Sequence, residues 1–525
     1  MRKIIRFILN DEIVETQAHP ALTLLDFIRK QKHLTGTKEG CREGDCGACS
    51  VILGESNGSY IRYKAVNSCL FPIGDADGKH VVTIEGINID GLTPFQQALL
   101  NEGGTQCGFC TPGFVVSFAA YLLSADKFIY ADAIDSMTGN LCRCTGHTGI
   151  RRSAEIVIDY INRNWDKTTF HRAESLINLN LLPSYFTAVP DKLSKLIIEN
   201  EEICAEEKKS CLQRENDIIK PGIALAESGD MLVAERPNNF FQPKEELFWI
   251  SGGTDIFVQK GDELIHRDVN LLSSVLAEPV ITIDGSACKI SANTTVADLE
   301  NSSLFNQILP QFREIARLFG SQQIRNRATI GGNINNASPI GDMTIFFLAM
   351  NAKIILGTGN KWRELLLKEY FKGYKTLDRN PGEIMKSLFF RLPHKRAKIS
   401  FEKVCRRTYL DIASVNSAMY LLTDNDIIST IHLSSGGTGP VPMYLKSTCE
   451  YLTGKAVSYN TIKEAARIAD GEISPISDIR GSAEYKRLLL RQLLFAHFLK
   501  FFPEKINTFK DKNFYHRDTE NTEIF

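Results

Sequence analysis

The stretch GTKEGCREGDCGACS, residues 36–50, places three cysteines within nine residues. Cys41, Cys46 and Cys49 have the spacing C-x4-C-x2-C, and Cys69 follows in NSCLFP. This is a spacing with which four thiolates hold a [2Fe–2S] cluster. Small residues let a backbone curl around such a cluster, and this loop contains Gly40, Gly44, Gly47 and Ala48. Structural zinc also uses four thiolates but favours CxxC pairs, so the sequence predicts an iron–sulfur site.

A second set of four cysteines follows in TQCGFCTPG and GNLCRCTGH. Cys107 and Cys110 form a CxxC pair, and Cys142 and Cys144 form a CxC pair. Taken alone, this set suits a zinc site or a redox disulfide as well as a cluster. Beside the first set, it predicts a second [2Fe–2S] cluster.

The residues around the first set indicate a small sheet with one helix. KIIRFILNDEIVET predicts a hairpin that turns at Asn10–Asp11. TLLDFIRKQ predicts a helix capped by Thr23, with Asp26 in its first turn, and VVTIEG predicts a returning strand. Strands, one helix and a cysteine loop between them are the β-grasp plan of plant-type ferredoxins, which we expect over residues 1–90.

Helices are expected to carry the second set. Thr93 and Pro94 predict the start of the helix PFQQALLNE, and Gly103 lies just past its end. Pro112 starts PGFVVSFAAYLLS, and TGIRRSAEIVIDYINRNW forms a third amphipathic stretch. Both cysteine pairs therefore lie where helices begin or end, and N–H groups at helix N-termini stabilise an anionic cluster. We expect a helical-bundle domain over residues 91–165.

Composition limits the class of protein. The chain has 525 residues, enough for roughly three or four domains, with 43% hydrophobic residues and a formal charge of −1. This balance gives no electrostatic case for binding nucleic acid or a membrane surface. The apolar run at the N-terminus is too short for a secretory signal, and no stretch approaches a membrane span. We therefore expect a soluble cytoplasmic protein.

The thirteen cysteines, an odd number in a large chain, argue against a disulfide framework. Eight belong to the two sets. The others are expected to be buried small hydrophobic residues: Cys204, Cys211, Cys288, Cys405 and Cys449. The histidines are scattered, and no acid–base pair or Ser–His–Asp set stands out, so we expect no catalytic residue on this chain.

Two glycine turns indicate a site for phosphate groups. In LFWISGGTDIFVQKGD a short apolar strand runs into residues 252–255, and such a turn lets backbone N–H groups approach a phosphate. In GSQQIRNRATIGGNINNASPIGD a second turn carries hydroxyl and amide donors at Thr329 and Asn333, and Asp342 is placed to accept from a sugar hydroxyl. Two such turns without GxGxxG suggest a dinucleotide bound outside the Rossmann plan.

The order of the ferredoxin loop, QCGFCTPG and GNLCRCTG resembles the molybdenum hydroxylases, the family of xanthine dehydrogenase and aldehyde oxidase. The resemblance implies that Cys107, Cys110, Cys142 and Cys144 hold the cluster nearest the molybdopterin, and that the first set holds the cluster nearer the flavin. It also implies that Gln106 faces the pterin, although an ordinary polar residue at a helix end is the alternative. His147 replaces a tyrosine of the family motif.

The two glycine turns resemble the FAD domain of the same family, which has the vanillyl-alcohol-oxidase-type fold. The resemblance implies pyrophosphate contacts from Trp249, Ile250, Ser251, Gly252, Gly253, Thr254, Asp255 and Ile256, and from Thr329, Ile330, Gly331, Gly332 and Asn333. Phe319 and Asp342 would contact the adenosine side. Lys403 matches a flavin-contacting lysine, and Met385 an apolar contact. Phe319 and Met385 could equally be plain core residues.

The expected fold class is multidomain α+β. The domains are a β-grasp [2Fe–2S] ferredoxin domain over 1–90, a helical [2Fe–2S] domain over 91–165, a linker over 166–230, an FAD-binding domain over 231–395, a CO-dehydrogenase-flavoprotein-like α+β domain over 396–505 and a polar tail over 506–525. Within the linker, LNLLPSYF is apolar and is expected to pack on a neighbour.

The resemblance implies the small, electron-transfer subunit of a split bacterial xanthine dehydrogenase. A large partner subunit would hold the molybdopterin and the substrate, in a heterodimer or an (αβ)2 heterotetramer. Electrons would pass from molybdenum through the two clusters to FAD and then to NAD+. The alternatives are the same role in an aldehyde or other N-heterocycle hydroxylase, or a stand-alone iron–sulfur flavoprotein carrier.

Overall fold

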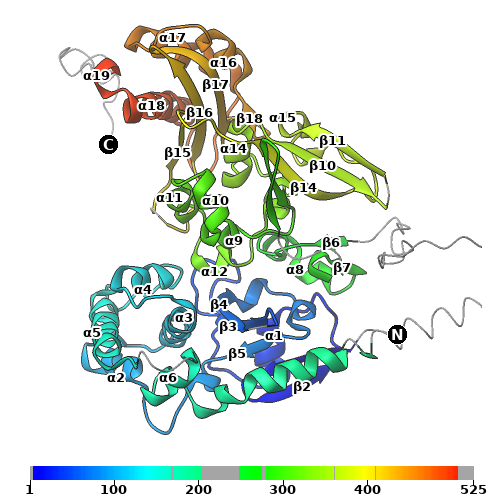
Figure 1. Cartoon of the computed structure of the whole chain (residues 1–525), viewed down its shortest axis with the longest axis vertical. Coiled ribbons are helices and arrows are strands. Elements are labelled where there is room, and N and C mark those ends of the chain that lie inside the picture. The colour runs from blue at the N-terminus through cyan, green and yellow to red at the C-terminus, as the bar shows by residue number, and fades with distance from the viewer. Residues whose placement is uncertain are drawn as a thin grey trace, which may run out of the picture. The chain divides into compact units, whose positions relative to one another are not determined.

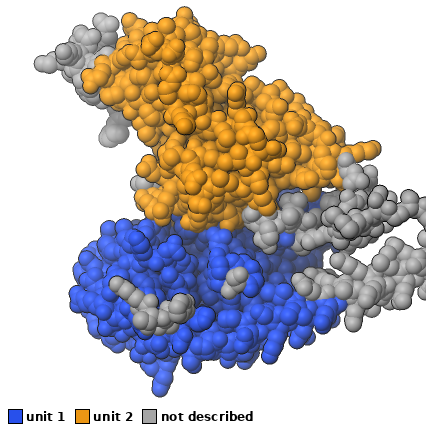
Figure 2. Space-filling model, viewed as in Figure 1, with its two compact units in different colours: residues 1–276, 321–328 blue, residues 277–320, 329–525 orange. Residues whose placement is uncertain are grey.

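A computed structural model of the chain forms two compact units (Figures 1 and 2). It describes residues 4–58, 60–166, 171–200, 202–203, 248–274, 280–359, 361–407 and 409–506. Unit 1 comprises Met1–Leu276 and Ser321–Ala328, and unit 2 comprises Ala277–Gly320 and Thr329–Phe525. The charged part of the expected linker, Cys204, Cys211 and the tail beyond residue 506 lie outside the described residues.

Unit 1 begins with a five-stranded sheet in the order β2-β1-β5-β3-β4, in which only the β1–β5 pair is parallel. Its strands are β1 (Ile5–Leu9), β2 (Glu12–Thr16), β3 (Ser50–Ser56), β4 (Ile61–Asn67) and β5 (His80–Val82). The helix α1 (Leu24–Asp26) continues as the π-helical turn η1 (Phe27–Gln31), and its Leu24 and Phe27 share a core with Phe7 and Val51. This is the expected β-grasp plan.

Local signals explain the elements of this sheet. Asn10 has a φ of 56°, and the register pairs Leu9 with Glu12, so the hairpin turns at Asn10–Asp11 as predicted. The Thr23 hydroxyl accepts from the N–H of Asp26 at 3.2 Å, which caps α1 as predicted.

Helices follow the sheet in unit 1. They are α2 (Pro94–Asn101), α3 (Thr111–Ser124), α4 (Tyr130–Ser136), α5 (Thr148–Asn164) and α6 (Arg172–Asn178). Thr93 and Gln96 form a capping box, which fixes the predicted start of α2, and the rings of Phe95 and Phe118 stack at 4.0 Å. The α3 helix begins one residue before Pro112.

The first part of the expected linker is folded. After α6 comes the 3-10 helix η5 (Ser184–Thr187), and Leu181, Leu182 and Phe186 are buried in the same core as α3. The expected packing of LNLLPSYF is therefore confirmed. Val189, Leu193 and Leu196 pack on Ile8 of the sheet. These apolar residues bury about as much surface as core residues elsewhere, which outweighs the charged character of the surrounding segment.

The rest of unit 1 is a set of short elements. They are η2 (Ser68–Leu70), η3 (Ile73–Ala76), η4 (Glu85–Ile87), the parallel strands β6 (Phe248–Ile250) and β7 (Val269–Leu271), α8 (Ile256–Leu264), η7 (Leu272–Ser274) and α12 (Gln322–Arg325).

Unit 2 contains two larger antiparallel sheets, a two-stranded antiparallel sheet formed by β12 and β13, and helices. The first sheet has the order β11-β10-β14-β9-β8, and the second β15-β16-β17-β18. The strands are β8 (Ile281–Asp284), β9 (Ala287–Ser291), β10 (Lys353–Thr358), β11 (Lys361–Leu366), β12 (Phe371–Gly373), β13 (Thr376–Leu377), β14 (Ile384–Arg391), β15 (Lys398–Val404), β16 (Val415–Asp424), β17 (Ile427–Gly436) and β18 (Met443–Tyr444). The helices are α9 (Val296–Asn301), α10 (Ser303–Ile308), α11 (Phe312–Arg317), α13 (Ile330–Asn335), α14 (Asp342–Ala349), α15 (Leu367–Tyr370), α16 (Lys446–Leu452), α17 (Tyr459–Glu472), α18 (Ala483–Phe501) and α19 (Pro503–Ile506).

Among the described residues, no helix combines the length and the apolar character needed to cross a membrane. Of the five cysteines outside the two sets, Cys288 and Cys449 are buried, as expected, whereas Cys405 is partly exposed.

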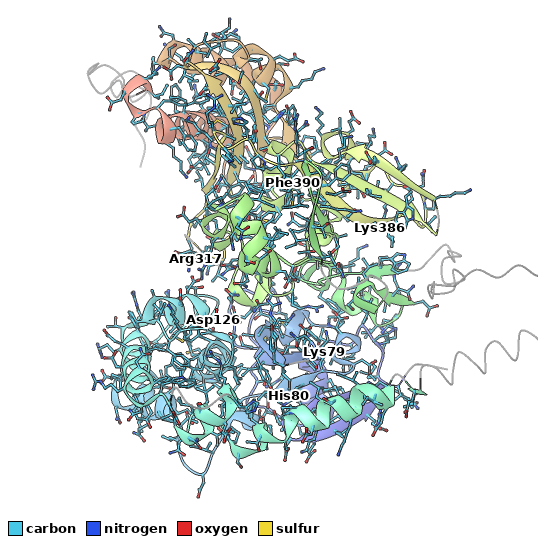
Figure 3. All side chains as sticks on the ribbon, in the orientation of Figure 1. Lys79, His80, Asp126, Arg317, Lys386 and Phe390 are labelled. Atoms are coloured by element: carbon cyan, nitrogen blue, oxygen red, sulfur yellow. The ribbon has the colours of Figure 1, made fainter. Side chains whose placement is uncertain are left out.

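Two buried histidines make stability depend on pH. His497 on α18 lies between the hydroxyls of Ser400, at 2.6 Å, and Ser417, at 3.0 Å. Burial, with a smaller contribution from Lys500, lowers the pKa of His497 to about 3. Burial likewise lowers the pKa of His80 in unit 1 to about 4 (Figure 3). Both rings are therefore neutral in the folded chain at neutral pH.

Acidification is expected to destabilise unit 2 through His497. The unfolded chain binds this proton near pH 6.5 and the folded chain only near pH 3, so stability is lost as the pH falls through this window. The loss from this one group is about 2 kcal/mol near pH 5. Urea unfolding between pH 7 and pH 4.5 would measure it, and His497→Gln should flatten the slope. An unchanged slope in that variant would assign the effect to other groups.

Candidate functional site

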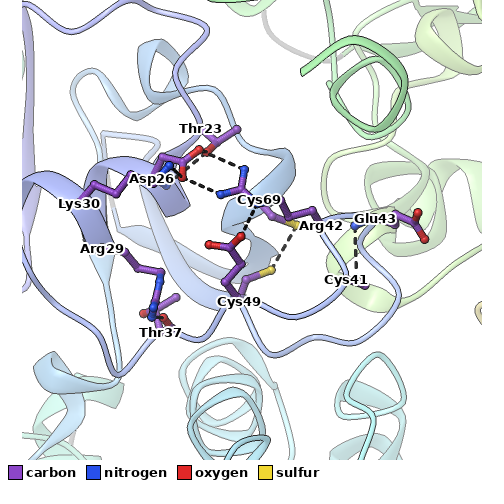
Figure 4. Close-up of polar contacts among 11 residues, drawn as sticks. Thr23, Asp26, Arg29, Lys30, Thr37, Cys41, Arg42, Glu43, Cys49 and Cys69 are labelled. Atoms are coloured by element: carbon purple, nitrogen blue, oxygen red, sulfur yellow. Dashed lines mark hydrogen bonds and ion pairs between the residues drawn. The ribbon is translucent and has the colours of Figure 1, made fainter. Parts of the chain in front are cut away.

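The ends of one hairpin bring two thiols of the first set together. Cys49 directly precedes β3, and Cys69 lies on η2, directly after β4. Because Ser50 pairs with Asn67, the two sulfur atoms lie 3.3 Å apart (Figure 4). The Ser68 hydroxyl donates to the Cys49 carbonyl at 2.7 Å, which fixes this end of the hairpin. Both thiols are buried.

The glycine loop brings the other two thiols of the first set together. Cys41 and Cys46 are hydrogen-bonded to each other, which lowers the pKa of Cys41 to about 5 and raises the pKa of Cys46. The N–H of Glu43 also donates to the Cys41 sulfur at 3.3 Å. A side chain at Gly40 would place a carbon 2.7 Å from the Cys46 sulfur, so the expected need for a glycine here has a direct steric cause.

An ion pair anchors the tip of this loop to α1. Arg42 has a φ of 57°, and its guanidinium lies 2.7 Å from Asp26 and 2.6 Å from Glu39 (Figure 4). Burial raises the pKa of Asp26, but hydrogen bonds from Arg42 and Lys30 outweigh it and hold the pKa well below its usual range. The sequence placed Asp26 at the helix start but gave no sign of this partner.

The second set lies at the starts of two helices, as predicted. Cys110 is the N-cap of α3, and Cys142 and Cys144 lie in the loop before α5. The Cys107 and Cys144 sulfurs are 3.6 Å apart, and Cys110 is hydrogen-bonded to Cys142. Burial raises the pKa of Cys110 to about 12. Burial also acts to raise the pKa of Cys142, but hydrogen bonds from Thr145 bring it below its ordinary value.

Each set of four thiols is paired two by two. The pairs are Cys41–Cys46 and Cys49–Cys69 in the first set, and Cys107–Cys144 and Cys110–Cys142 in the second. A [2Fe–2S] cluster needs one such pair for each of its two irons, so the donors fit two clusters.

His147, which replaces a tyrosine of the family motif, contacts the second set. Its φ is 68°, and its Nε2 accepts a hydrogen bond from the N–H of Cys142 at 3.2 Å. The ring also lies edge-on to Phe114, with centroids 5.7 Å apart. A tyrosine ring has no nitrogen, so this hydrogen bond to a ring nitrogen depends on the histidine. The sequence showed that a histidine replaces the tyrosine of the motif, but it did not predict this hydrogen bond.

Hydrogen bonds join the two cysteine loops directly. The N–H of Leu141 donates to the carbonyl of Cys46 at 3.0 Å, and the Asn140 amide donates to the carbonyl of Gly47 at 3.0 Å. Leu141 precedes Cys142, so this hydrogen bond joins a cysteine of the first set to the residue next to a cysteine of the second set. The sequence placed both sets in adjacent domains but could not predict this junction.

Gly113→Ala is expected to disturb this junction. A β-carbon at Gly113 would lie 2.5 Å from the Gly47 carbonyl and 2.9 Å from the Asn140 amide. The overpacking should cost about 1–3 kcal/mol and reduce the iron-to-protein ratio of the purified chain. Gly471→Ala is a matched helical control, because nothing lies within 4 Å of its added carbon and it should be neutral or stabilising. Equal iron content in both variants would contradict the expectation.

The first glycine turn lies in unit 1, between β6 and α8. Gly253 has a φ of +81°, which a side chain would strain. The N–H groups of Gly253 and Thr254 make no hydrogen bond to any described residue, and α8 begins at Ile256. Free N–H groups beside a helix start suit an anionic phosphate, so this turn fits the pyrophosphate of FAD.

The second glycine turn lies in unit 2, where Thr329 caps α13. Its N–H groups are bonded within the unit: those of Gly331 and Gly332 donate to the Ala292 carbonyl and the Thr329 hydroxyl, at 2.8 and 3.0 Å. The Asn333 side-chain oxygen accepts from Thr344 at 3.0 Å. The groups of this turn that remain available to a ligand are therefore in its side chains, for example the amide nitrogen of Asn333.

Two further predicted flavin residues form a buried ion pair in unit 2. Lys403 Nζ lies 2.7 Å from Asp342 Oδ2 and 2.7 Å from the Leu318 carbonyl. Asp342 Oδ1 accepts from Asn416 at 2.5 Å, so both carboxylate oxygens already have protein partners. Each oxygen can accept a further hydrogen bond, so the predicted contact of Asp342 with a sugar hydroxyl stays a prediction.

Met385 and Phe319, the two predicted apolar flavin residues, differ in how deeply they are buried. Met385 is buried in β14, and the Asn335 amide contacts its sulfur at 3.6 Å. Phe319 follows α11 and is partly exposed. Gln106 is exposed beside Cys107. The roles of all the predicted FAD and pterin residues stay predictions.

Four family models match the chain. They are "2Fe-2S iron-sulfur cluster binding domain" over residues 7–73, "[2Fe-2S] binding domain" over 83–155, "FAD binding domain in molybdopterin dehydrogenase" over 236–394 and "CO dehydrogenase flavoprotein C-terminal domain" over 400–501. The chain is similar to the molybdenum hydroxylases. It carries the two [2Fe–2S] domains and the FAD-binding domain of these enzymes, and its expected multidomain α+β fold is confirmed.

Several molybdenum hydroxylases are similar to this chain along most of its length. Xanthine dehydrogenase of Emericella nidulans is 28% identical over 86% of the chain, and xanthine dehydrogenase 1 of Arabidopsis thaliana is 27% identical over 91%. Aldehyde oxidase 2 of Macaca fascicularis is 27% identical over 96%. The chain spans only 35%, 38% and 39% of the lengths of these relatives.

Solved structures of molybdenum hydroxylase chains align with about half of this chain. A chain of the Cu,Mo-CO dehydrogenase is 25% identical, with 48% of this chain and 87% of that chain covered and a TM-score of 0.45. A chain of quinoline 2-oxidoreductase from Pseudomonas putida 86 is 21% identical, with 50% and 92% covered and a TM-score of 0.45.

Proposed function

We propose that the chain is the electron-transfer subunit of a xanthine dehydrogenase, with cytoplasmic location, and that a partner subunit holds the molybdopterin and oxidises hypoxanthine and xanthine to urate. When bound, the two clusters and FAD supply one-electron and hydride-level redox chemistry, in the order molybdenum, second cluster, first cluster, FAD, NAD+. The residues of this chain hold, orient and insulate these groups.

The exposed edge of the second set is the observation that carries the proposal. Cys107 and Cys144 are exposed, whereas Cys49 and Cys69 of the first set are buried. Phe109 and Leu141 flank this edge, with 47% and 50% of their surfaces exposed. Large apolar side chains beside an open redox site favour a partner that covers them, which supports docking of the molybdopterin subunit here.

The junction between the two loops supports the proposed order of electron flow. The hydrogen bond from Leu141 to Cys46 links the loop of the second set to the glycine loop of the first set. Unit 1 also contains the glycine turn after β6 that fits a flavin pyrophosphate. Both sets and this flavin turn therefore belong to unit 1, and the exposed thiols, Cys107 and Cys144, are those of the second set.

A pocket in unit 2 supports NAD+ as the acceptor. It has a volume of about 430 Å³ and is lined by Arg406 and Arg480, together with Ile479 and Tyr485. Two guanidinium groups suit a pyrophosphate, and the exposed apolar surfaces of Ile479 and Tyr485 suit a flat ring. The strand β15, which carries Lys403, runs into the pocket at Val404.

A second candidate is the same role in an aldehyde-oxidising hydroxylase. The observation in its favour is the 27% identity to aldehyde oxidase 2 of Macaca fascicularis, close to the 28% identity to a xanthine dehydrogenase. A stand-alone carrier is disfavoured by the exposed apolar rim at Phe109 and Leu141.

An anaerobic visible spectrum of the natively purified complex tests the proposal. Xanthine should bleach the flavin and iron–sulfur absorbance, and NAD+ should restore it. If xanthine has no effect while NADH still bleaches the centres, the electron-transfer role stands and the substrate assignment is wrong. Migration of the chain as a free monomer in native extracts would instead favour the stand-alone carrier.

A further inference from the structure

A short segment of the chain between the two glycine turns belongs to unit 1. Residues Ser321–Ala328 are part of unit 1, although the chain on both sides belongs to unit 2. We call this segment the strap. Its Gln323 amide donates to the Ser117 hydroxyl at 3.0 Å and to the Asn140 amide oxygen at 3.1 Å. Its Asn326 amide donates to the Ala65 carbonyl at 2.8 Å. The strap is therefore built into both cluster domains.

Arg327, at the end of the strap, contacts the chain just after Cys69. Its guanidinium forms a close ion pair with Asp75 on η3 and lies 4.5 Å from the centre of the Phe71 ring. The side chains of Arg327 and Asp75 are only 10% and 1% exposed. Asp75 also accepts from the Ser273 hydroxyl at 2.5 Å.

The same arginine contacts the glycine turn after β6. Arg327 Nε donates to the Gly252 carbonyl at 3.3 Å. A β-carbon at Gly252 would lie 2.1 Å from the Arg327 carbonyl, and one at Gly253 would lie 3.0 Å from the Leu70 carbonyl. The Gly252–Gly253 turn therefore packs closely on the backbone of Arg327 and on the backbone of Leu70, the neighbour of Cys69.

We propose that Arg327 is a positioning residue that fixes the Gly252–Gly253 turn against the Cys69 turn and thereby determines how tightly the chain holds FAD. The inference rests on the proposed function only for the identity of the flavin site. Its physical basis is that a buried guanidinium with three partners has one allowed position, so the carbonyl of Gly252 and the N–H groups that follow it are held in a fixed orientation. An ordered turn binds a phosphate without a further loss of backbone entropy.

The test compares FAD affinity across variants of the full-length complex. FAD is titrated into flavin-depleted complex, and the iron-to-protein ratio and the iron–sulfur circular dichroism are recorded on the same samples. Arg327→Met should raise the Kd for FAD by at least about tenfold, with iron content unchanged, and Arg327→Lys should recover part of the loss. Arg487→Met is the control, because Arg487 also pairs with a carboxylate and carbonyls but lies on α18.

Arg327→Met leaves the buried carboxylate of Asp75 without its ion-pair partner, which can prevent folding. A double variant keeps the test decisive in that case. Asp75→Asn with Arg327→Met removes both charges and should fold, yet it still lacks the contact to Gly252, so its Kd for FAD should also rise about tenfold. A Kd within about twofold of wild type in a folded variant, or an equal loss of iron and FAD, would overturn the proposal. These readouts need neither xanthine nor NAD+, so an incorrect substrate assignment would leave them unchanged.

Discussion

Replacing Cys110 by serine is expected to abolish electron flow from xanthine to NAD+ in the assembled enzyme. The variant should keep NADH-to-dye activity within about twofold of wild type. Cys110 caps α3 and pairs with Cys142, so its loss removes one of the four sulfur donors of the second set. A serine hydroxyl does not ionise near neutral pH and is a poor ligand for iron. The measurement is steady-state turnover with xanthine and NAD+, beside dye reduction by NADH.

Cys288→Ser is the matched control for this prediction. Cys288 is fully buried in β9 of unit 2 and belongs to neither set. Its replacement introduces the same chemical change and should leave both activities in place. If Cys110→Ser lowers both activities equally in a folded complex, the assignment of the second set to the molybdenum side of the chain is wrong.

Replacing Lys403 by methionine is expected to destabilise unit 2 by about 3–5 kcal/mol, because removal of one partner leaves a buried charge unpaired. The side chains of Lys403 and Asp342 are 1% and 10% exposed, and their ion pair is 2.7 Å long. The Leu318 carbonyl would lose its donor as well. Urea unfolding of the flavin-free chain measures this effect without the contribution of bound FAD to stability.

Two further variants identify the cause of that loss. Lys446→Met removes an exposed lysine that lies 3.8 Å from Glu450 and should change stability by less than about 0.5 kcal/mol. Lys403→Met with Asp342→Asn removes both buried charges and should recover a large part of the loss. A double variant as unstable as Lys403→Met would show that lost packing, and not the unpaired carboxylate, is the cause.

Features encoded within a few residues could be predicted from the sequence. The hairpin at Asn10–Asp11, the cap at Thr23 and the capping box at Thr93 each depend on neighbours within about one turn of chain. The two sets of cysteines could be recognised because their spacing is typical of [2Fe–2S] sites. Their pairing two by two fits that assignment.

Features that depend on distant residues could not be predicted. Gln323 contacts Ser117, which is 206 residues away, and Arg327 contacts Asp75, which is 252 residues away. Neither pair has a periodic or spaced signal in the sequence. The sequence indicated the packing of LNLLPSYF but not that of Val189, Leu193 and Leu196, because charged residues surround these three apolar side chains. The flavin contacts assigned by resemblance stay predictions, and the ion pair and hydrogen bond that Asp342 makes with Lys403 and Asn416 had no signal in the sequence.

The strap has a consequence for the order of events during synthesis. When the ribosome has made the first 276 residues, the polar groups of Asp75, Asn140 and Ser117 still lack the partners that residues 323 and 327 later supply. Unit 1 therefore cannot reach its final packing until residue 328 has left the ribosome, by which time the first strands of unit 2 have also been made. A contact across so many residues closes slowly and late in folding. We therefore expect the contacts that surround the two cysteine loops to be completed later in synthesis than their position near the N-terminus alone would suggest.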